Sequence, residues 1–288
     1  MSAPAREGDR SIPVPEGAGA GEVRPVAPPP SARAQADVAA RLRAAGCVFA
    51  EEEAAILLAC AGTARQLESM VAGRSTGVPL EQVVGWAQFC GLRVTVRPGV
   101  FVPRRRTEHL VRAAAAVTGP GAVVVDLCCG TGAVGLAVRS LVGDVELHAS
   151  DLEPAAVACA RHNLRGIGRV YQGDLFAPLP RHLEGRVDTV TANVPYVPTA
   201  AIATLPAEAR EHEPRSALDG GGDGLELARR VVAGAPRWLR PGGHLVIETG
   251  RHQAGRAAAV FTAGGLATRT DSSSRWDVAV LVGTRARA

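Results

Sequence analysis

The chain has 288 residues, of which 47% are apolar and 21% charged, enough to bury a sizeable core in one large or two modest domains. Its 32 basic residues are all arginine and outnumber the 28 acidic ones only slightly, so charge gives weak support for an attraction to nucleic acid or ribosomes. The six cysteines show no C-x-x-C pair and no metal-ligand spacing, which indicates reduced, buried thiols and no metal site.

The beginning of the chain predicts neither export nor a membrane span. The longest apolar run there, residues 54–61, is too short to cross a bilayer, and residues 1–30 lack the apolar core of a signal peptide. We therefore expect a cytoplasmic protein that does not associate with membranes. Residues 1–30 are rich in Pro, Gly and Ala without apolar periodicity, so we expect a disordered tail.

A helical pattern follows over residues 31–86. Val38, Leu42 and Val48 recur in a first segment, and the apolar residues 54–58 follow three glutamates that complement a helix N-terminus. We expect a small helical domain in this range.

A hairpin pattern separates that region from the rest of the chain. Residues 88–96, and then residues 99–103, alternate as hairpin strands do. The pattern predicts a β-hairpin linker over residues 87–106.

From residue 107 onward, strand-like runs alternate with helical ones, which predicts an α/β fold with a doubly wound, largely parallel, Rossmann-like sheet over residues 107–288. The polar, glycine-rich stretch at 210–224 is a candidate lid or substrate loop. Strands are expected at 123–127, 145–149, 169–172, 187–192, 244–248 and 278–281, and helices at 134–142, 154–164 and 225–238.

A glycine-rich loop, residues 126–135, follows the first strand of this region and opens a helix. Glycines at such a turn let a ligand approach the backbone closely. The spacing of Gly130, Gly132 and Gly135 also fits the dinucleotide fingerprint, so the loop alone does not separate a nicotinamide cofactor from S-adenosylmethionine. The cofactor-binding residues expected here are Asp126, Cys128, Cys129, Gly130, Thr131 and Gly132.

Two further strand ends carry groups that an adenosyl ligand needs. Asp151 ends the second strand, where a carboxylate can accept both ribose hydroxyls, although it could also be a helix N-cap. Asp174 follows the third strand, where it could accept from an adenine amino group or simply form a turn, and Leu175 and Phe176 could cover the ring. The order of these strand ends favours an adenosyl ligand.

Asn193, Val194, Pro195 and Tyr196 follow the apolar run 187–192, so they lie at the C-terminal end of a buried strand, where open α/β sheets bind ligands. The Asn193 side chain and the Val194 carbonyl offer two acceptors to one planar –NH2 group. This suits methylation of an amide or amino nitrogen, and Tyr196 would pack against that group. A plain strand-to-loop turn is the alternative interpretation of the motif.

Several motifs in the same order resemble those of the HemK/PrmC family of protein glutamine-N(5) methyltransferases. They are residues 79–85, residues 101–104 with Thr107 and Glu108, the glycine-rich loop, the Asn193 turn, residues 213–218 with Gly220 and Gly221, and residues 241–243. The resemblance implies a Rossmann-like methyltransferase domain that uses S-adenosylmethionine, preceded by a helical domain that recognises a protein substrate. It implies methylation of a glutamine side chain, notably in the Gly-Gly-Gln motif of peptide chain release factors.

The resemblance also assigns roles at the Asn193 turn. Asn193 and Tyr196 would be catalytic, all four residues 193–196 would bind the substrate, and Asn193 would also contact the cofactor. The chain departs from the family pattern at Val194, where a proline is usual, and at Arg104–Arg106, where a Pro-Glu pair is usual. Val194 can supply the same carbonyl, so the chemistry is expected to persist. The arginine run is either a different substrate surface or a solvated charge run.

Other functions remain open at this point. Adenine-N(6) methylation of nucleic acid needs the same –NH2 cradle, but the chain has few aromatic residues and no evident recognition domain. A catalytically silent adenosyl-binding or ribosome-interaction protein is a second alternative, and a nicotinamide oxidoreductase is a third. We expect a monomer that acts on a protein and forms no stable complex with nucleic acid.

Overall fold

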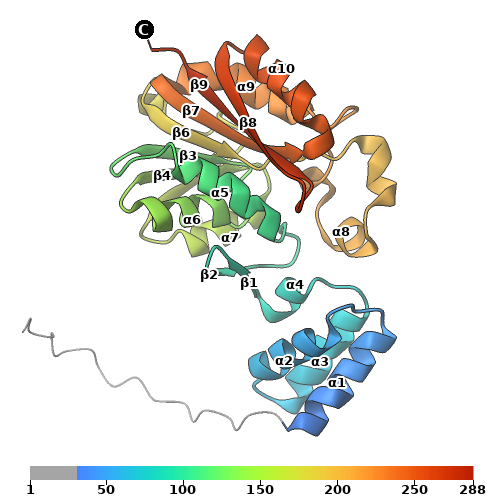
Figure 1. Cartoon of the computed structure of the whole chain (residues 1–288). Coiled ribbons are helices and arrows are strands. Elements are labelled where there is room, and N and C mark those ends of the chain that lie inside the picture. Colours follow the sequence, from blue (N-terminus) through green and yellow to red (C-terminus); the bar gives the residue numbers. More distant parts are fainter. Residues whose placement is uncertain (1–30, 288) are drawn as a thin grey trace, which may run out of the picture.

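The computed structural model describes residues 31–287, so the tail expected over residues 1–30 lies outside the described residues. An N-terminal group of helices leads through a two-stranded hairpin into a larger unit built on a seven-stranded sheet (Figure 1). The helices are α1 (Ala32–Ala44), α2 (Ala50–Cys60), α3 (Ala64–Ser75), α4 (Leu80–Val84), α5 (Glu108–Ala115), α6 (Ala133–Val142), α7 (Pro154–Asn163), α8 (Ala207–His212), α9 (Glu226–Trp238) and α10 (Ala254–Ala263). The strands are β1 (Trp86–Phe89), β2 (Leu92–Thr95), β3 (Val123–Leu127), β4 (Glu146–Asp151), β5 (Gly168–Gln172), β6 (Val187–Ala192), β7 (Leu239–Gly250), β8 (Leu266–Ser273) and β9 (Val278–Arg285).

The N-terminal helices pack around a small apolar core of their own, in which Leu42, Leu57 and Val71 are fully buried. Ser31 caps α1 by accepting a hydrogen bond from the backbone of residue 34, and Thr63 caps α3 in the same way. These helices account for the helical periodicity of the sequence.

The sheet has the order β5-β4-β3-β6-β7-β9-β8, with β9 antiparallel to both of its neighbours. The doubly wound α/β fold expected from the sequence is confirmed. Each expected strand from residue 123 onward is present, but β8 was not predicted, because this edge strand exposes most of its polar side chains and gives no apolar signal. Residues 99–103 form no strand, so the hairpin consists of β1 and β2 alone.

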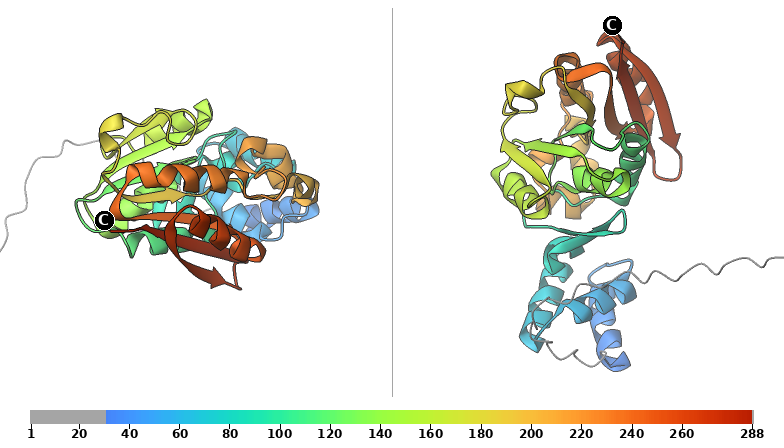
Figure 2. Two further views of the ribbon diagram at one scale, coloured as in Figure 1. Left: turned by 90° about the horizontal axis from the view of Figure 1, so that it is seen from above. Right: turned by 90° about the vertical axis from the view of Figure 1, so that its left-hand side faces the viewer.

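Helices cover both faces of the sheet (Figures 1 and 2). On one face, Val246 and Val280 pack with residues of α5 and α6, while Leu245 and Leu281 pack with α9 and α10 on the other. Because successive strand residues point to opposite faces, the strands that are covered twice are apolar throughout. Their C-terminal ends are thereby held rigidly at one edge.

The hairpin is fixed to the larger unit near the glycine-rich loop. Phe89 and Val94 are buried against α5. At the end of α7, Asn163 accepts from the backbone N–H of Thr95 at 3.0 Å and donates to the carbonyls of Thr95 and Thr131, each at 2.9 Å. One side chain therefore joins the hairpin to the loop. No helix in the part of the chain that the structure describes is long and apolar enough to cross a membrane.

Candidate active site

The carboxyl ends of four parallel strands open onto one cavity of about 320 Å³. β5, β4, β3 and β6 are neighbours in this order, so the residues that follow them meet at one edge of the sheet. The site residues expected from the sequence line this cavity, with the exceptions of Gly132 and Phe176. A volume of this size lies in the usual range for small-molecule sites.

The glycine-rich loop presents its backbone to the cavity. Gly130 has a φ of +55°, and a Cβ there would meet no atom within 4 Å, so the backbone at this position borders open space. Gly135 serves packing instead, because a Cβ would come within 2.9 Å of the Leu147 side chain and push α6 off β4. Gly132 packs toward Leu164, the residue that follows α7, which explains why it does not line the cavity. The loop fits a ligand that approaches the main chain closely.

Asp126 holds the end of this loop by a hydrogen bond to Gly135. Its side chain is buried, and its two oxygens accept hydrogen bonds from the Gly135 N–H at 3.0 Å and the Thr191 hydroxyl at 2.9 Å. Burial raises its pKa to about 7, against the lowering effect of these two hydrogen bonds. Asp126 thus ties the start of α6 to β3 and β6, in addition to bordering the cavity.

The raised pKa of Asp126 makes stability depend on pH. An acid whose pKa is higher in the folded state stabilises the fold below the unfolded pKa, near 4, and loses this contribution as pH rises to about 7. We expect the free energy of unfolding of wild type, relative to Asp126→Asn, to fall from pH 5 to pH 7 and then level off, as measured by urea unfolding across pH. A pH-independent difference would contradict this account.

Asp151 joins the second strand to the loop. One carboxylate oxygen accepts from the Gly130 N–H at 2.8 Å and the other from the Glu153 N–H at 3.0 Å, while burial raises its pKa. Each oxygen keeps a further lone pair for a ligand hydroxyl. The N-cap of α7 is Glu153, so the helix-capping interpretation of Asp151 is wrong. Its carboxylate instead orders the loop and borders the cavity.

The third strand end contains a residue pair that the sequence analysis missed. Arg230 of α9 lines the cavity, and its NH2 lies 2.5 Å from Asp174 Oδ2. The other oxygen of Asp174 accepts no hydrogen bond from residues 31–287 and is available to a ligand. Leu175 lines the cavity as expected, but Phe176 stacks on Trp238 in the core with ring centroids 5.7 Å apart. The expectation that Phe176 covers a ligand ring is wrong, because its ring packs between α9 and the sheet.

The acceptor turn, residues 193–196, lies at the other end of the cavity. Asn193 Nδ2 donates to the Thr107 hydroxyl at 3.4 Å, which leaves Asn193 Oδ1 without a protein donor among the described residues. The Val194 carbonyl likewise accepts no hydrogen bond from the part of the chain that the structure describes. Tyr196 donates to Glu248 at 3.4 Å, and the Arg106 guanidinium lies 5.7 Å from the Tyr196 ring centroid.

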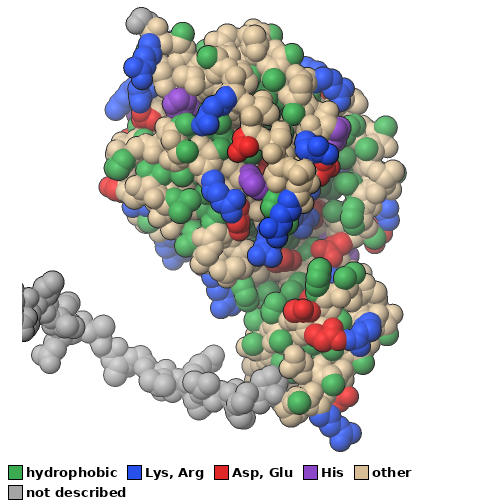
Figure 3. Space-filling model, viewed as in Figure 1, with side chains coloured by type: hydrophobic (Ala, Val, Ile, Leu, Met, Phe, Trp, Pro, Cys, Tyr) green, Lys and Arg blue, Asp and Glu red, His purple; other side chains and the backbone are tan. Residues whose placement is uncertain are grey.

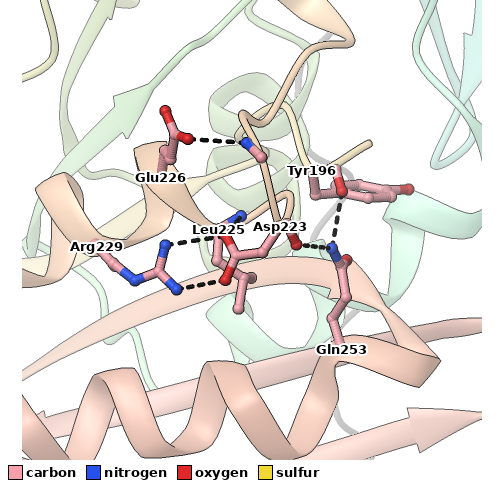
Figure 4. A network of polar contacts seen from close by, with 7 residues as sticks. Tyr196, Asp223, Leu225, Glu226, Arg229 and Gln253 are labelled. Carbon is pink, nitrogen blue, oxygen red and sulfur yellow. Dashed lines mark hydrogen bonds and ion pairs between the residues drawn. The ribbon is translucent and has the colours of Figure 1, made fainter. Parts of the chain in front are cut away.

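A second loop, residues 218–225, supports the acceptor turn from behind (Figure 4). Its backbone pairs with Val197, which donates to the Leu218 carbonyl and accepts from the Gly220 N–H. The buried Gln253 side chain donates to the carbonyls of Tyr196 at 3.0 Å and Asp223 at 3.1 Å, as Figure 4 shows. The backbone of the turn is therefore held on both sides by hydrogen bonds.

Gly224 cannot accept a side chain at this contact. Its φ is +78°, and a Cβ would overlap the Tyr196 carbonyl and the Gln253 amide. We expect Gly224→Ala to destabilise the protein by about 2 kcal/mol or more and to lower activity, as measured by thermal unfolding and methyl transfer. Gly222→Ala is the matched control, because its Cβ would meet only Glu226, at 3.7 Å. Equal behaviour of the two variants would contradict the proposed close packing.

A buried carboxylate links the segment before α5 to the loop after α8. Glu213 accepts from the backbone N–H of Val102 at 3.1 Å and lies 2.5 Å from Arg104 NH2. Residues 101–104 and 213–218, two of the motifs noted in the sequence, are therefore direct neighbours in space. Arg104 thus pairs with the buried Glu213, whereas Arg106 lines the cavity.

The comparisons with known proteins agree with this geometry. A family model described as methyltransferase small domain matches residues 91–225. The release factor glutamine methyltransferase of Mycolicibacterium smegmatis is 41% identical over 214 residues, which cover 73% of this chain and 75% of that relative. This chain belongs to the release factor glutamine methyltransferase family. Membership decides between the two cofactors that the glycine-rich loop alone left open: the chain is an S-adenosylmethionine-dependent methyltransferase.

The chain is also similar to a methyltransferase whose name states a different acceptor. The 4-amino-L-phenylalanine/4-methylamino-L-phenylalanine methyltransferase of Streptomyces pristinaespiralis is 39% identical over 67% of this chain and 68% of its own. Among solved structures, a methyltransferase from Pyrococcus furiosus aligns with a TM-score of 0.52 and 15% identity, over 68% of this chain and 90% of that one. This last similarity shows the fold alone.

Proposed function

We propose that this methyltransferase acts on the side-chain amide nitrogen of a glutamine in the Gly-Gly-Gln motif of a peptide chain release factor. The observation that carries the proposal is the pair of free acceptors at the acceptor turn, Asn193 Oδ1 and the Val194 carbonyl, which border the same cavity as the glycine-rich loop. A primary amide has two N–H donors in one plane, and two acceptors can bind both of them. The names of the relatives support a release factor as the substrate.

The cavity has the groups that S-adenosylmethionine requires. Asp151 would accept the ribose hydroxyls, the backbone at Gly130 would approach the ligand, and Asp174 would accept from the adenine amino group while Arg230 holds its other oxygen. When bound, the cofactor supplies an electrophilic methyl group on a sulfonium centre. The same strand edge brings this end of the cavity and the acceptor turn together.

The acceptor turn would promote methyl transfer by orienting the substrate amide. An amide nitrogen is a weak nucleophile because its lone pair is delocalised into the carbonyl. Asn193 and Val194 would fix the amide plane and turn the π-face of the nitrogen toward the methyl donor, and Tyr196 would pack against the amide. The acceptors would also stabilise positive charge that develops on the N–H groups in the transition state, so positioning and electrostatics supply the rate without a dedicated base.

The N-terminal helices are suited to recognise the protein around the glutamine. We assign residues 31–86 to substrate recognition, residues 87–106 to the linker and residues 107–288 to catalysis. Arg74 of α3 lies 3.3 Å from Glu208 of α8, and Gln82 donates to the carbonyl of His212 at 3.4 Å. These contacts connect the helical unit to the segment that leads into the second loop.

Nucleic acid is less well supported as a substrate. On the face drawn in Figure 3, arginine side chains are dispersed among acidic and apolar ones and form no continuous basic patch. Adenine-N(6) methylation requires a basic face and stacking aromatic residues for a flipped base. Few aromatic residues line the cavity, and Phe89, Phe101 and Tyr196 are those that do.

Methyl transfer from labelled S-adenosylmethionine tests the proposal. The acceptors are a release factor with an intact Gly-Gly-Gln motif, the same protein with that glutamine changed to alanine, and free 4-amino-L-phenylalanine. We expect label only on the intact release factor. Label on the amino acid but not on the release factor would overturn the proposal. It would indicate that the acceptor turn binds the amino group of an aryl amine instead.

A further inference from the structure

Among the described residues, Arg106 and Arg230 are the arginines that line the cavity, and they differ in their partners. Arg230 lies 2.5 Å from Asp174, so its charge is paired at hydrogen-bond distance. For Arg106 the nearest carboxylate oxygen is Glu248 Oε1, 3.8 Å from Nε, which is too long for a hydrogen bond. The Arg106 side chain is 41% exposed, and its terminal N–H groups make no hydrogen bond to residues 31–287. A charged donor that a ligand can reach therefore borders the cavity.

The guanidinium of Arg106 is held beside the acceptor turn. Its carbon lies 5.7 Å from the centroid of the Tyr196 ring. The Tyr196 hydroxyl donates to Oε1 of the buried Glu248, the same oxygen that lies near Arg106 Nε. Thr107, the next residue in the chain, accepts a hydrogen bond from Asn193 at 3.4 Å. Arg106 Nε is buried, so the terminal nitrogens are the donors that can reach a ligand at this end of the cavity.

The three arginines in the run Arg104–Arg106 have different surroundings. Arg104 pairs with the buried Glu213, and Arg105 is exposed and does not line the cavity. Arg106 is the member of the run that borders the ligand site. The run is therefore neither a uniform substrate surface nor a plain solvated charge run, and Arg106 requires an explanation of its own.

The acceptor turn alone does not distinguish an amide from an amine. Asn193 Oδ1 and the Val194 carbonyl accept N–H groups, and an aryl amine offers the same planar –NH2 as a primary amide. The amide differs by its carbonyl oxygen, which needs a donor when it leaves water. A guanidinium forms a charge-assisted hydrogen bond to such an oxygen, and these bonds are stronger than those between neutral groups.

We propose that Arg106 is a specificity-determining residue that binds the carbonyl oxygen of the amide whose nitrogen the acceptor turn holds. It selects an amide over an amine as the acceptor. A hydrogen bond to the carbonyl strengthens the delocalisation of the nitrogen lone pair, so Arg106 contributes to binding and not to the nucleophilicity of the nitrogen. Its effect on methyl transfer rests on the proposed function, whereas the choice between amide and amine can be measured with small ligands.

Benzamide and aniline are a matched pair of probes, because both present an –NH2 group on an aromatic framework and only benzamide has a carbonyl. Their Kd values would be measured by nuclear magnetic resonance titration of the enzyme saturated with S-adenosylhomocysteine. We expect wild type to prefer benzamide by about tenfold or more, and Arg106→Met to lose most of this preference. Arg105→Met is the matched control, since it removes the neighbouring charge outside the cavity, and it should keep the preference.

Kinetics on the release factor separate binding from chemistry. Arg106→Met should raise KM about tenfold or more while kcat changes less than about threefold, as expected for an interaction that is equally strong in the ground and transition states. Thermal unfolding checks that the variants are folded. Arg106→Met in the Glu248→Gln background removes both charges and replaces the single variant if the unpaired Glu248 unfolds it.

Three results would overturn the proposal. They are a wild type without preference for benzamide, an equal preference in wild type and Arg106→Met, and an equal loss in Arg105→Met. The second result, together with a weaker Kd for S-adenosylmethionine in Arg106→Met, would assign Arg106 to the cofactor carboxylate instead. A wild-type enzyme that fails to methylate the release factor contradicts the proposed function alone, because the benzamide and aniline titrations still decide the role of Arg106.

Discussion

Asn193→Ala is expected to lower turnover on the release factor by about two orders of magnitude or more, while binding of S-adenosylmethionine largely survives. The variant removes the side-chain acceptor that fixes the amide plane and leaves the glycine-rich loop and Asp151 intact. Loss of one preorganised hydrogen-bonding group at a reacting centre typically costs 10² to 10³ in kcat. Single-turnover methyl transfer and calorimetric titration of the cofactor measure the two quantities separately.

Gln88→Ala serves as the control for the loss of a side-chain amide, because Gln88 lies exposed on the hairpin strand β1. It should retain wild-type turnover. If Asn193→Ala also kept near-wild-type turnover, the assignment of the acceptor turn as the catalytic element would have to be abandoned.

Asp151→Ala is expected to weaken binding of S-adenosylmethionine by about 100-fold or more. Hydrogen bonds to a charged group contribute roughly 1.5–3 kcal/mol each, and this carboxylate would accept from two ribose hydroxyls. The variant also frees the Gly130 N–H, so the loop that borders the ligand loses its anchor at 2.8 Å. The Kd from titration calorimetry is the direct measurement.

Asp144→Ala removes the same charge at the other end of the strand and is the matched control. The Asp144 side chain is 90% exposed, and among the described residues it pairs only with Arg139. Its variant should bind the cofactor as wild type does. An Asp151→Ala protein with an unchanged Kd would show that the ribose is bound elsewhere.

The sequence predicted those site residues that directly follow the parallel strands. Asp151 and Asn193 each follow a buried strand, and the carboxyl ends of parallel strands must meet at one edge, so their convergence required no knowledge of side-chain packing. Gly130 was predictable for a similar reason, because a loop between a strand and a helix at that edge must border the ligand.

The supporting residues were not predictable from the same patterns. Thr107 contacts Asn193 across 86 positions, Glu248 contacts Tyr196 across 52, and Arg230 pairs with Asp174 across 56. Such contacts depend on strand register and on helix rotation, neither of which a hydrophobic pattern specifies. Phe176 shows the opposite error, since an aromatic residue beside a site residue turned out to pack into the core.

The most direct test of the central claim is to locate the methyl group. A release factor incubated with S-adenosylmethionine and either wild-type enzyme or Asn193→Ala would be digested and sequenced by tandem mass spectrometry. The account predicts one methyl group on the side-chain nitrogen of the Gly-Gly-Gln glutamine after wild-type treatment and almost none with the variant. A methyl group on another residue, or equal modification by both proteins, would contradict it.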